Sequence, residues 1–372
     1  MDFLPDPFRT VLAFVLVLGV LVFIHEMGHY LAARWRGVFV ERFSIGFGRP
    51  IKEWTDRRGT AWQIGWLPLG GYVKLHGQES PADVTDEERA RWRAGETFHD
   101  KPVGDRAIVV AAGPIANFAL AAVLFAALFS VVGRPVGTAT VGTVVAGGAA
   151  ERAGLLVGDR ITALDDQPVT RFEQVQSHIQ PRANQPVRIQ ILREGRELTL
   201  TATPTPAPGT EATAAPRGLL GVGGGAPAYE PVGIFSAIWG GVAYTADVTV
   251  QTLAGIWKMI SGQSGTGDIG GPLRIAQLSG QVAEMGLASL VSFMAILSVN
   301  LALINLFPIP VLDGGHLVFY AAEAIRGRPL PPRAVEMGFR AGFALLVALF
   351  LFATWNDLSN FGLFRWVRGL LG

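Results

Sequence analysis

The chain has 372 residues, of which half are hydrophobic and 16% are charged, a balance too apolar for an ordinary soluble enzyme and typical of a membrane protein with a soluble insert. A formal net charge of +1 gives no basic field for binding nucleic acid. The absence of cysteine excludes disulfides, thiolate metal sites and cysteine nucleophiles, so His, Asp and Glu remain as strong metal ligands.

The first predicted element is a transmembrane helix within residues 1–34, with its apolar part over about 8–33. It contains an HExxH sequence, His25-Glu26-Met27-Gly28-His29. Helical spacing places His25 and His29 on one face, so that both can bind one zinc ion, with Glu26 beside them as general base. The alternative is a polar cluster without metal, which is disfavoured because three such residues at membrane depth are costly. We interpret the segment as retained and not as a signal peptide, because HExxH occupies the place of a cleavage site.

Three further apolar segments, at about 107–132, 287–312 and 337–354, are long enough to cross a bilayer. Basic residues flank the loop between the first two spans, which predicts that this loop is cytoplasmic and that both chain ends face outward. About fourteen apolar residues, or roughly 21 Å of helix, precede the motif. We therefore expect it in the cytoplasmic part of the hydrocarbon core.

The third span closes with NLFPIPVLDGGH, residues 305–316, where two prolines and two glycines predict a broken helix that lines a cavity. Asp313 lies at this level, and a carboxylate within a membrane usually faces a partner or water. It is thus a candidate third zinc ligand. Two alternatives stay open: Asp313 as a turn residue beside Gly314, and His316 as the third ligand.

The remaining segments complete a predicted domain order. Residues 35–106 form a cytoplasmic, membrane-associated β region and 137–205 a small α+β domain of short strands. Residues 206–230 are expected to be a linker, since the glycine run at 221–225 lacks the ending of a phosphate loop. Residues 231–286 are expected as helix on the outer membrane surface. The other boundaries are 107–133 and 287–313 for spans, 314–336 for a cytoplasmic loop, and 337–372 for the last span and tail.

Five sequence pieces together resemble the bacterial RseP-type site-2 proteases of peptidase family M50: HEMGH, the GFG at 46–48, GGYVKLHG at 70–77, GPIAN at 113–117, and NLFPIPVLDGGH. The resemblance covers nearly the whole chain. It implies a polytopic α-helical membrane protein with four transmembrane helices, a membrane-associated β element and one inserted α+β PDZ domain. The PDZ domain would be periplasmic, and the protein would lie in a bacterial inner membrane, in contact with lipid.

The resemblance also implies an activity, that of an intramembrane zinc endopeptidase (EC 3.4.24) that cleaves transmembrane helices of single-pass proteins. Expected substrates are anti-sigma factors already cut by an upstream site-1 protease, in sigma factor signalling, and signal-peptide remnants. The family pattern assigns Zn²⁺ to His25, His29 and Asp313 and the general base to Glu26. Substrate binding would fall to Asn305 and to the β element, where an extended substrate could pair as an added strand; the residues concerned are Gly70, Gly71, Tyr72, Val73 and Lys74.

Several alternatives stay open from sequence. Asn305 could serve only in helix packing, and Asn117 could serve in packing or in substrate contact. The inserted domain could be a steric filter or could capture a new C-terminus near residues 154–159. The whole protein could instead be an inactive PDZ scaffold or a zinc transporter. No role is assigned to the remaining histidines, His76, His99 and His178.

Overall fold

The computed structural model describes residues 7–78, 84–85, 87, 92–207, 216–226, 228–262 and 270–360. It divides into two compact units. The helical unit comprises the chain up to Leu128 and from Phe235 onward, and the inserted unit comprises Phe129–Ile234. The metal-site residues expected from the sequence all belong to the helical unit.

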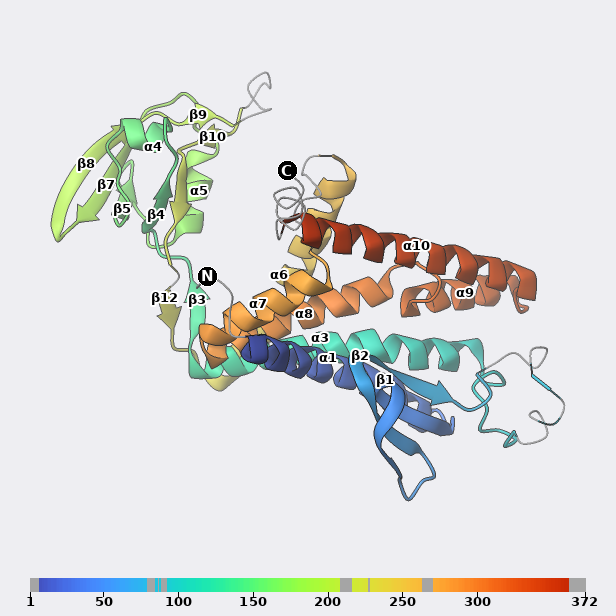
Figure 1. Cartoon of the computed structure of the whole chain (residues 1–372). Coiled ribbons are helices and arrows are strands. Elements are labelled where there is room, and N and C mark those ends of the chain that lie inside the picture. Colours follow the sequence, from blue (N-terminus) through green and yellow to red (C-terminus); the bar gives the residue numbers. More distant parts are fainter. Residues whose placement is uncertain are drawn as a thin grey trace, which may run out of the picture. The chain divides into compact units, whose positions relative to one another are not determined.

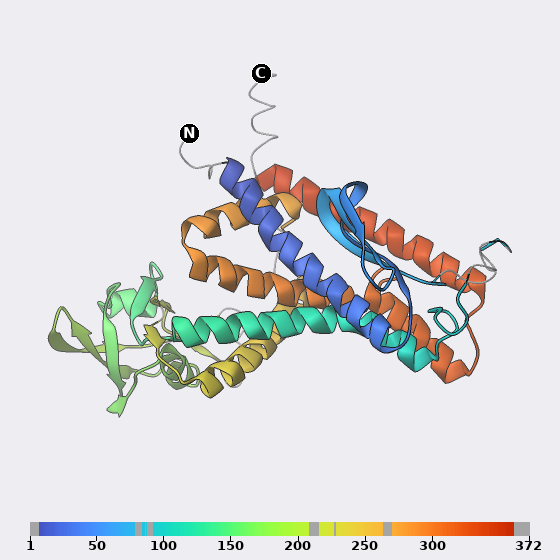
Figure 2. The same cartoon turned by 90° about the horizontal axis from the view of Figure 1, so that it is seen from below.

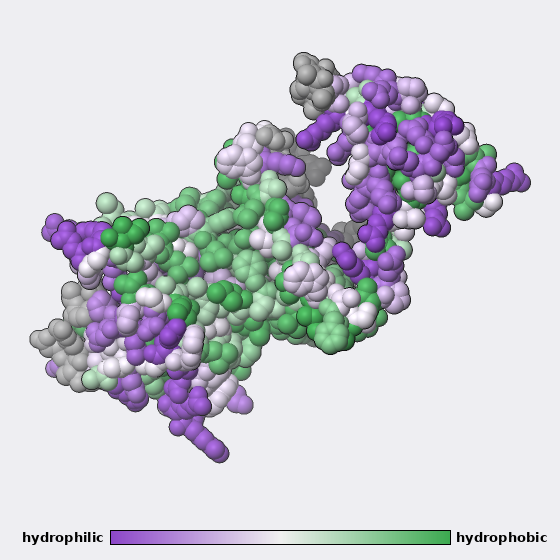
Figure 3. Space-filling model, turned by 180° about the vertical axis from the view of Figure 1, so that it is seen from behind, coloured by the Kyte–Doolittle hydropathy of each residue, from purple (hydrophilic) through white to green (hydrophobic). Residues whose placement is uncertain are grey.

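Among the described residues, four helices are long and apolar enough to cross a membrane, and they run broadly alongside one another in the helical unit (Figures 1 and 2). Large apolar side chains gather over the face of this unit seen in Figure 3, as expected for surface that contacts lipid. The third helix ends at Leu306, before the predicted end at residue 312. The helices are α1 (Pro7–Trp35), α3 (Val103–Val131), α8 (Leu287–Leu306) and α10 (Pro332–Asn360).

Two more helices, α6 (Ile234–Ile260) and α7 (Pro272–Glu284), occupy the region predicted to be helical at 231–286. Both helices pack closely against the long helices. A Cβ at Gly241 of α6 would lie 2.5 Å from the Ala122 carbonyl oxygen of α3. The buried Asp357 of α10 accepts hydrogen bonds from the amides of Gly271 and Arg274, at 2.8 and 3.1 Å, and so caps the start of α7.

Strands β1 (Val40–Thr55) and β2 (Ala61–Leu75) form a strongly curled sheet against α1. Phe43 has Cα partners in both halves of β2, Val73 and Trp62, so the two strands wrap around it. Its fully buried ring packs edge-on against Tyr30 of α1, with ring centroids 5.8 Å apart. This aromatic contact fixes the sheet on the helix that carries both candidate histidines.

The chain breaks after α8 and then resumes as helix α9 (Asp313–Arg326). The broken helix predicted from the prolines is therefore present. The loop predicted for 314–336 is wrong over 314–326 and 332–336, which are helical. Gly314 and Gly315 belong to the first turn of this helix and do not interrupt it. Both are buried, and a Cβ at either position would meet backbone atoms of residues 306–310.

The inserted unit contains a four-stranded antiparallel sheet in the order β6-β5-β7-β8 and two short helices. Its core is made of alternate strand residues such as Ile161, Ile189 and Ile191, all fully buried. The strands are β5 (Arg160–Leu164), β6 (Gln167–Pro168), β7 (Val187–Arg193) and β8 (Arg196–Ala202), and the helices are α4 (Ala149–Arg152) and α5 (Phe172–Ile179).

The linker predicted at 206–230 is wrong over its described part, which completes the inserted unit. Leu220 lies in the core, and a Cβ at Gly142 would be 2.3 Å from the Gly224 carbonyl oxygen. The glycines therefore permit close strand contact, which composition alone cannot distinguish from flexibility. The pairs formed are β10 (Gly218–Leu219) with β9 (Thr205–Pro206), β11 (Val222–Gly224) with β4 (Val141–Val144), and β12 (Ala228–Glu230) with β3 (Arg134–Val136).

Candidate metal centre

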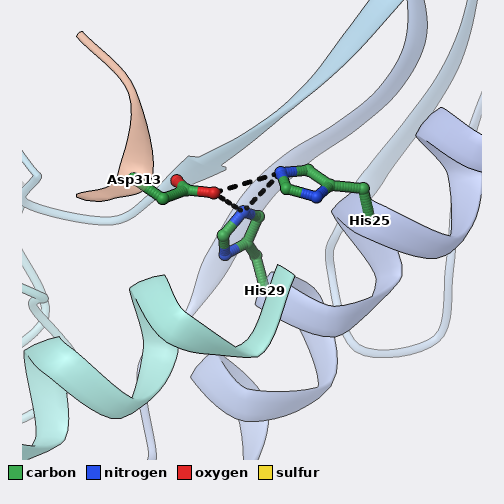
Figure 4. Close-up of side chains that lie close together, drawn as sticks. All are labelled: His25, His29 and Asp313. Carbon is green, nitrogen blue, oxygen red and sulfur yellow. Dashed lines mark hydrogen bonds and ion pairs between the residues drawn. The ribbon is translucent and has the colours of Figure 1, made fainter. Parts of the chain in front are cut away.

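Two histidines one turn apart on α1 meet a carboxylate from the first turn of α9 (Figure 4). The Nε2 atoms of His25 and His29 lie 3.2 Å apart. Asp313 Oδ2 is 3.2 Å from His25 Nε2 and 3.5 Å from His29 Nε2. All three side chains are largely shielded from solvent. The residues predicted to converge are thus side by side, although Asp313 lies 288 positions after His25 in the chain (313 minus 25).

The size of this triangle fits a zinc ion. In tetrahedral zinc sites the bonds to nitrogen and oxygen are about 2.0 to 2.2 Å, which sets neighbouring ligand atoms about 3.3 Å apart. The three observed separations lie on either side of that value. Among the described residues, this is the one group of three or more histidine and carboxylate side chains whose ligand atoms lie close enough together to hold a metal. His316, the rival third ligand, is not part of it.

Helix α3 holds the far side of both imidazole rings. His29 Nδ1 donates a hydrogen bond to the Val109 carbonyl at 2.9 Å, which leaves Nε2 free as a ligand. His25 Nδ1 lies 3.2 Å from the Asn117 carboxamide. Asn117 therefore neither packs passively nor faces substrate; it contacts a candidate ligand.

The Asn117 carboxamide also gives a test of fit. Its Nδ2 faces His25, and its Oδ1 is buried without a hydrogen-bond partner among the described residues. A histidine that binds metal through Nε2 carries its proton on Nδ1 and needs an acceptor there. A half-turn of the carboxamide would supply Oδ1 as that acceptor. The unpartnered oxygen is therefore what a metal-bound His25 requires.

Gly113 of α3 provides the space in which the rings stand. A Cβ at this position would lie 2.3 Å from His29 Nε2 and 2.9 Å from His25 Cε1. Gly28 of α1 allows the two helices to approach, since its Cβ would be 2.3 Å from the Ala112 carbonyl oxygen. The close contact of α1 with α3 thus depends on glycine at both positions.

A compact turn sets the direction of Asp313. Val311 has φ of 94°, a left-handed conformation that is strained for a β-branched residue. A Cβ at Gly314 would be 2.2 Å from the Leu306 carbonyl oxygen, and one at Gly315 would be 2.4 Å from that of Ile309. Larger residues would open the turn, so the LDGG sequence is matched to this geometry.

A cavity of about 1080 Å³ adjoins the metal centre. Glu26 and Asn305 line it, as do Gly71, Tyr72 and Val73 of β2. The predicted substrate residues Gly70 and Lys74 are not among its lining residues. A Cβ at Gly70 would meet the Phe47 ring, and Lys74 forms an ion pair with Glu41 at 3.1 Å.

Two of the histidines without an assigned role have structural partners, and the third lines the cavity. His76 Nδ1 lies 2.8 Å from Glu41, and the imidazole and Lys74 hold the pKa of that carboxyl below its usual range although burial alone would raise it. His178 Nε2 lies 2.9 Å from Asp165 in the inserted unit. His99 lines the cavity beside the β element.

Comparison with known proteins gives extended matches. Residues 13–349 match the model of peptidase family M50. A protein of Rhizobium meliloti (strain 1021), named as a zinc metalloprotease, is 42% identical over 360 residues, which cover 94% of this chain and 96% of the relative. Metalloprotease MmpA of Caulobacter vibrioides is 38% identical over 385 residues, covering 95% and 96% respectively. A solution structure from Geobacillus thermodenitrificans matches 19% of the chain at 31% identity, with a TM-score of 0.17.

Proposed function

Because this chain belongs to peptidase family M50, whose members are membrane zinc metalloproteases, we propose that it is a site-2 type endopeptidase that cleaves transmembrane helices. The observation that carries the proposal is the buried triangle of His25, His29 and Asp313 beside Glu26. His25 and His29 lie on α1, one of the four helices able to span a bilayer. A hydrolytic centre so placed suits a substrate that is itself a membrane helix.

In the proposed hydrolysis, a zinc ion would supply Lewis-acid chemistry and Glu26 would transfer the proton. Zinc bound by three protein ligands supplies a Lewis acid and lowers the pKa of a coordinated water toward neutrality. Glu26, one residue after His25, lines the cavity and is placed to accept a proton from the attacking water. The same carboxylic acid then donates that proton to the leaving amide nitrogen.

A transmembrane substrate must lose helical hydrogen bonds before its peptide bonds can be attacked. Strand β2 is suited to replace them. Gly71 lies directly against α1, where its Cβ would be 3.1 Å from Glu26 Cγ. A substrate segment that adds to the β2 edge at Gly71, Tyr72 and Val73 would present its backbone beside Glu26. Asn305, across the cavity, offers a carboxamide to the same backbone.

For the inserted unit we propose a single periplasmic PDZ domain that filters substrates by size. Its first and last strands, β3 and β12, pair with each other, so the chain enters and leaves the unit at one place, as suits an insertion. A size filter agrees with a two-step pathway in a bacterial inner membrane. An upstream protease would first remove the outer part of a single-pass protein such as an anti-sigma factor or release a signal-peptide remnant.

The decisive experiment uses Glu26→Gln in purified full-length protein. We expect zinc content to stay at the wild-type level and cleavage of a membrane-helix substrate to fall by about 10² to 10⁴-fold. Unchanged cleavage by this variant would refute the base assignment. A wild-type protein that binds zinc yet cleaves no membrane helix, trimmed or intact, would favour a scaffold, and zinc flux into vesicles would favour a transporter.

The natural substrate follows from the same variant. Glu26→Gln expressed in its own cells should retain uncleaved single-pass proteins, which mass spectrometry of the purified complex identifies. Trimmed and untrimmed forms of a retained protein, offered to the wild-type enzyme, then test the filter. Equal cleavage of both forms would contradict it.

A further inference from the structure

Helix α3 contacts both halves of the metal centre, although it supplies no ligand. Near the middle of α3, Val109, Gly113 and Asn117 face the two histidine rings. One turn before Val109, Arg106 reaches α9 and forms an ion pair with Glu323, with Nη2 and Oε1 2.6 Å apart. Only 11% of the Arg106 side chain and 15% of the Glu323 side chain are exposed, so the pair is largely shielded from solvent in the wall of the cavity beside the metal centre.

The spacing of residues along α3 and α9 shows that the Arg106–Glu323 pair ties the two helices at a second level. Positions 106, 109, 113 and 117 lie on one face of α3, and positions 313, 316, 320 and 323 lie on one face of α9. Asp313, at the start of α9, meets the histidines held by the middle of α3, and Glu323, ten residues on, meets Arg106. Helix α9 is therefore tied at two levels, by the metal ligands and by the ion pair.

Arg106 is itself held in place. Its Nε donates a hydrogen bond to the Lys101 carbonyl at 3.1 Å, and its guanidinium lies 4.9 Å from the centre of the Tyr320 ring. Glu323 therefore binds a fixed cation instead of a flexible one. A fixed partner restricts both the rotation and the translation of α9 along α3.

We propose that the Arg106–Glu323 pair is the joint that sets the position of α9 on α3 and thereby presents Asp313 to the histidines. Both are positioning residues, because neither contacts the ligand atoms. The inference rests on the proposed function, since it concerns the same metal centre, but it can be tested without any proteolysis. Removing one partner leaves a buried charge unpaired, whereas replacing both by apolar residues of similar size removes that penalty.

The experiment compares four full-length proteins: wild type, Arg106→Met, Glu323→Met and the double variant. Each is loaded with Co²⁺ in place of zinc, because the visible absorption of Co²⁺ depends on the number and arrangement of its ligands. Asp313→Ala provides the reference spectrum of a centre without its third ligand. Zinc affinity is measured in parallel by competition with a chelator, and thermal unfolding shows whether each variant is folded.

We expect each single variant to bind zinc about 10- to 100-fold more weakly and to give a cobalt spectrum that moves toward that of Asp313→Ala. The double variant should stay impaired in both metal readouts, because it also lacks the joint, while its thermal stability recovers because no charge is left unpaired. Arg188→Met, which removes an exposed ion pair of the same 2.6 Å length in the inserted unit, should leave both readouts unchanged.

Two results would overturn the proposal. One is a wild-type spectrum and affinity in folded Arg106→Met and Glu323→Met. The other is a folded double variant whose spectrum and zinc affinity return to those of the wild type, which would assign the effect to the unpaired charge and not to a joint. Neither result bears on whether the wild-type protein cleaves membrane helices, which the Glu26→Gln experiment decides separately.

Discussion

Each histidine ring at the metal centre has one nitrogen directed at Asp313 and the other directed at α3. This division determines which nitrogen carries the proton, and so which one can bind metal. The HExxH spacing alone predicts that His25 and His29 share a face, but it says nothing of how the rings are turned. That information lies in Val109 and Asn117, on another helix.

The role of Asn117 gives a prediction at the residue scale. Asn117→Leu keeps the volume of the side chain but removes the acceptor for His25 Nδ1–H, so zinc affinity should fall by about 10- to 100-fold. Asn117→Asp retains an acceptor oxygen and should bind zinc as the wild type does. Competition with a chelator measures both. Equal affinity of the Leu variant and the wild type would mean that His25 needs no partner at Nδ1.

At the scale of elements, the contact between β2 and α1 governs how substrate can reach the base. A Cβ at Gly71 would lie 2.7 Å from the Ser44 carbonyl oxygen and 2.8 Å from Val22 Cγ1, in addition to its approach to Glu26. The backbone of β2 at Gly71 therefore lies in close contact with α1 and with β1. The position of this strand beside Glu26 depends on the absence of a side chain at Gly71.

Gly71→Ala should displace β2 from α1 and reduce cleavage by about 100-fold, because small misplacements near the reacting atoms have effects of that size. Zinc content should not change, since no ligand moves. Gly19→Ala is the matched control on α1, where a Cβ meets no described atom within 4 Å. Cleavage by Gly71→Ala at the rate of this control would argue against strand addition at β2.

The extent of prediction from sequence differs between elements for physical reasons. The four long helices follow from hydropathy, and the break after α8 follows from Pro308 and Pro310. The sequence does not predict helix α9, because the pair Gly314-Gly315 is typical of a loop. In the structure these glycines allow the first turn of α9 to pack against the backbone of residues 306–310. The meeting of Asp313 with the histidines came from family resemblance, because spacing along one chain does not determine contacts between helices.

At the scale of the whole molecule, each unit has a buried apolar core of its own, and the helical unit in addition exposes many large apolar side chains along its long helices. Within the inserted unit the side chain of Asp159 is almost fully buried and accepts hydrogen bonds from Arg193 at 2.7 Å and from the Leu156 amide at 2.8 Å. Burial alone would raise the pKa of Asp159, but these partners hold it below its ordinary value.

The inserted unit should therefore lose stability in acid. Because the folded-state pKa of Asp159 is depressed, its contribution is present above the unfolded value of about 3.9 and is lost as the pH falls through the folded value. Asp159→Asn should lower the stability of the inserted unit by about 2 kcal/mol at neutral pH and flatten its dependence on pH below 4. Hydrogen exchange at Ile189 and Ile191 reports this. Identical pH profiles would exclude Asp159 as the cause.

Composition misjudged the extent of the inserted unit, where residues rich in glycine, alanine and proline read as a linker. The described residues of this segment include β11 and β12, which pair with strands far earlier in the chain, and β10, which pairs with the nearby β9. Such pairing depends on long-range contacts, and glycine at close backbone approaches gives the same local signal as a flexible segment. The four helices able to cross a membrane carry a stronger local signal, because one continuous apolar run specifies each of them.

The lack of a side chain at Gly113 affects how the activity of related sequences should be predicted. A single methyl group there would intrude on the atoms that grip the ion, while leaving every ligand and the base unaltered in the primary sequence. A homologue with an intact HExxH and LDG but alanine at the position of Gly113 should thus be inactive, although its motifs would predict an active enzyme.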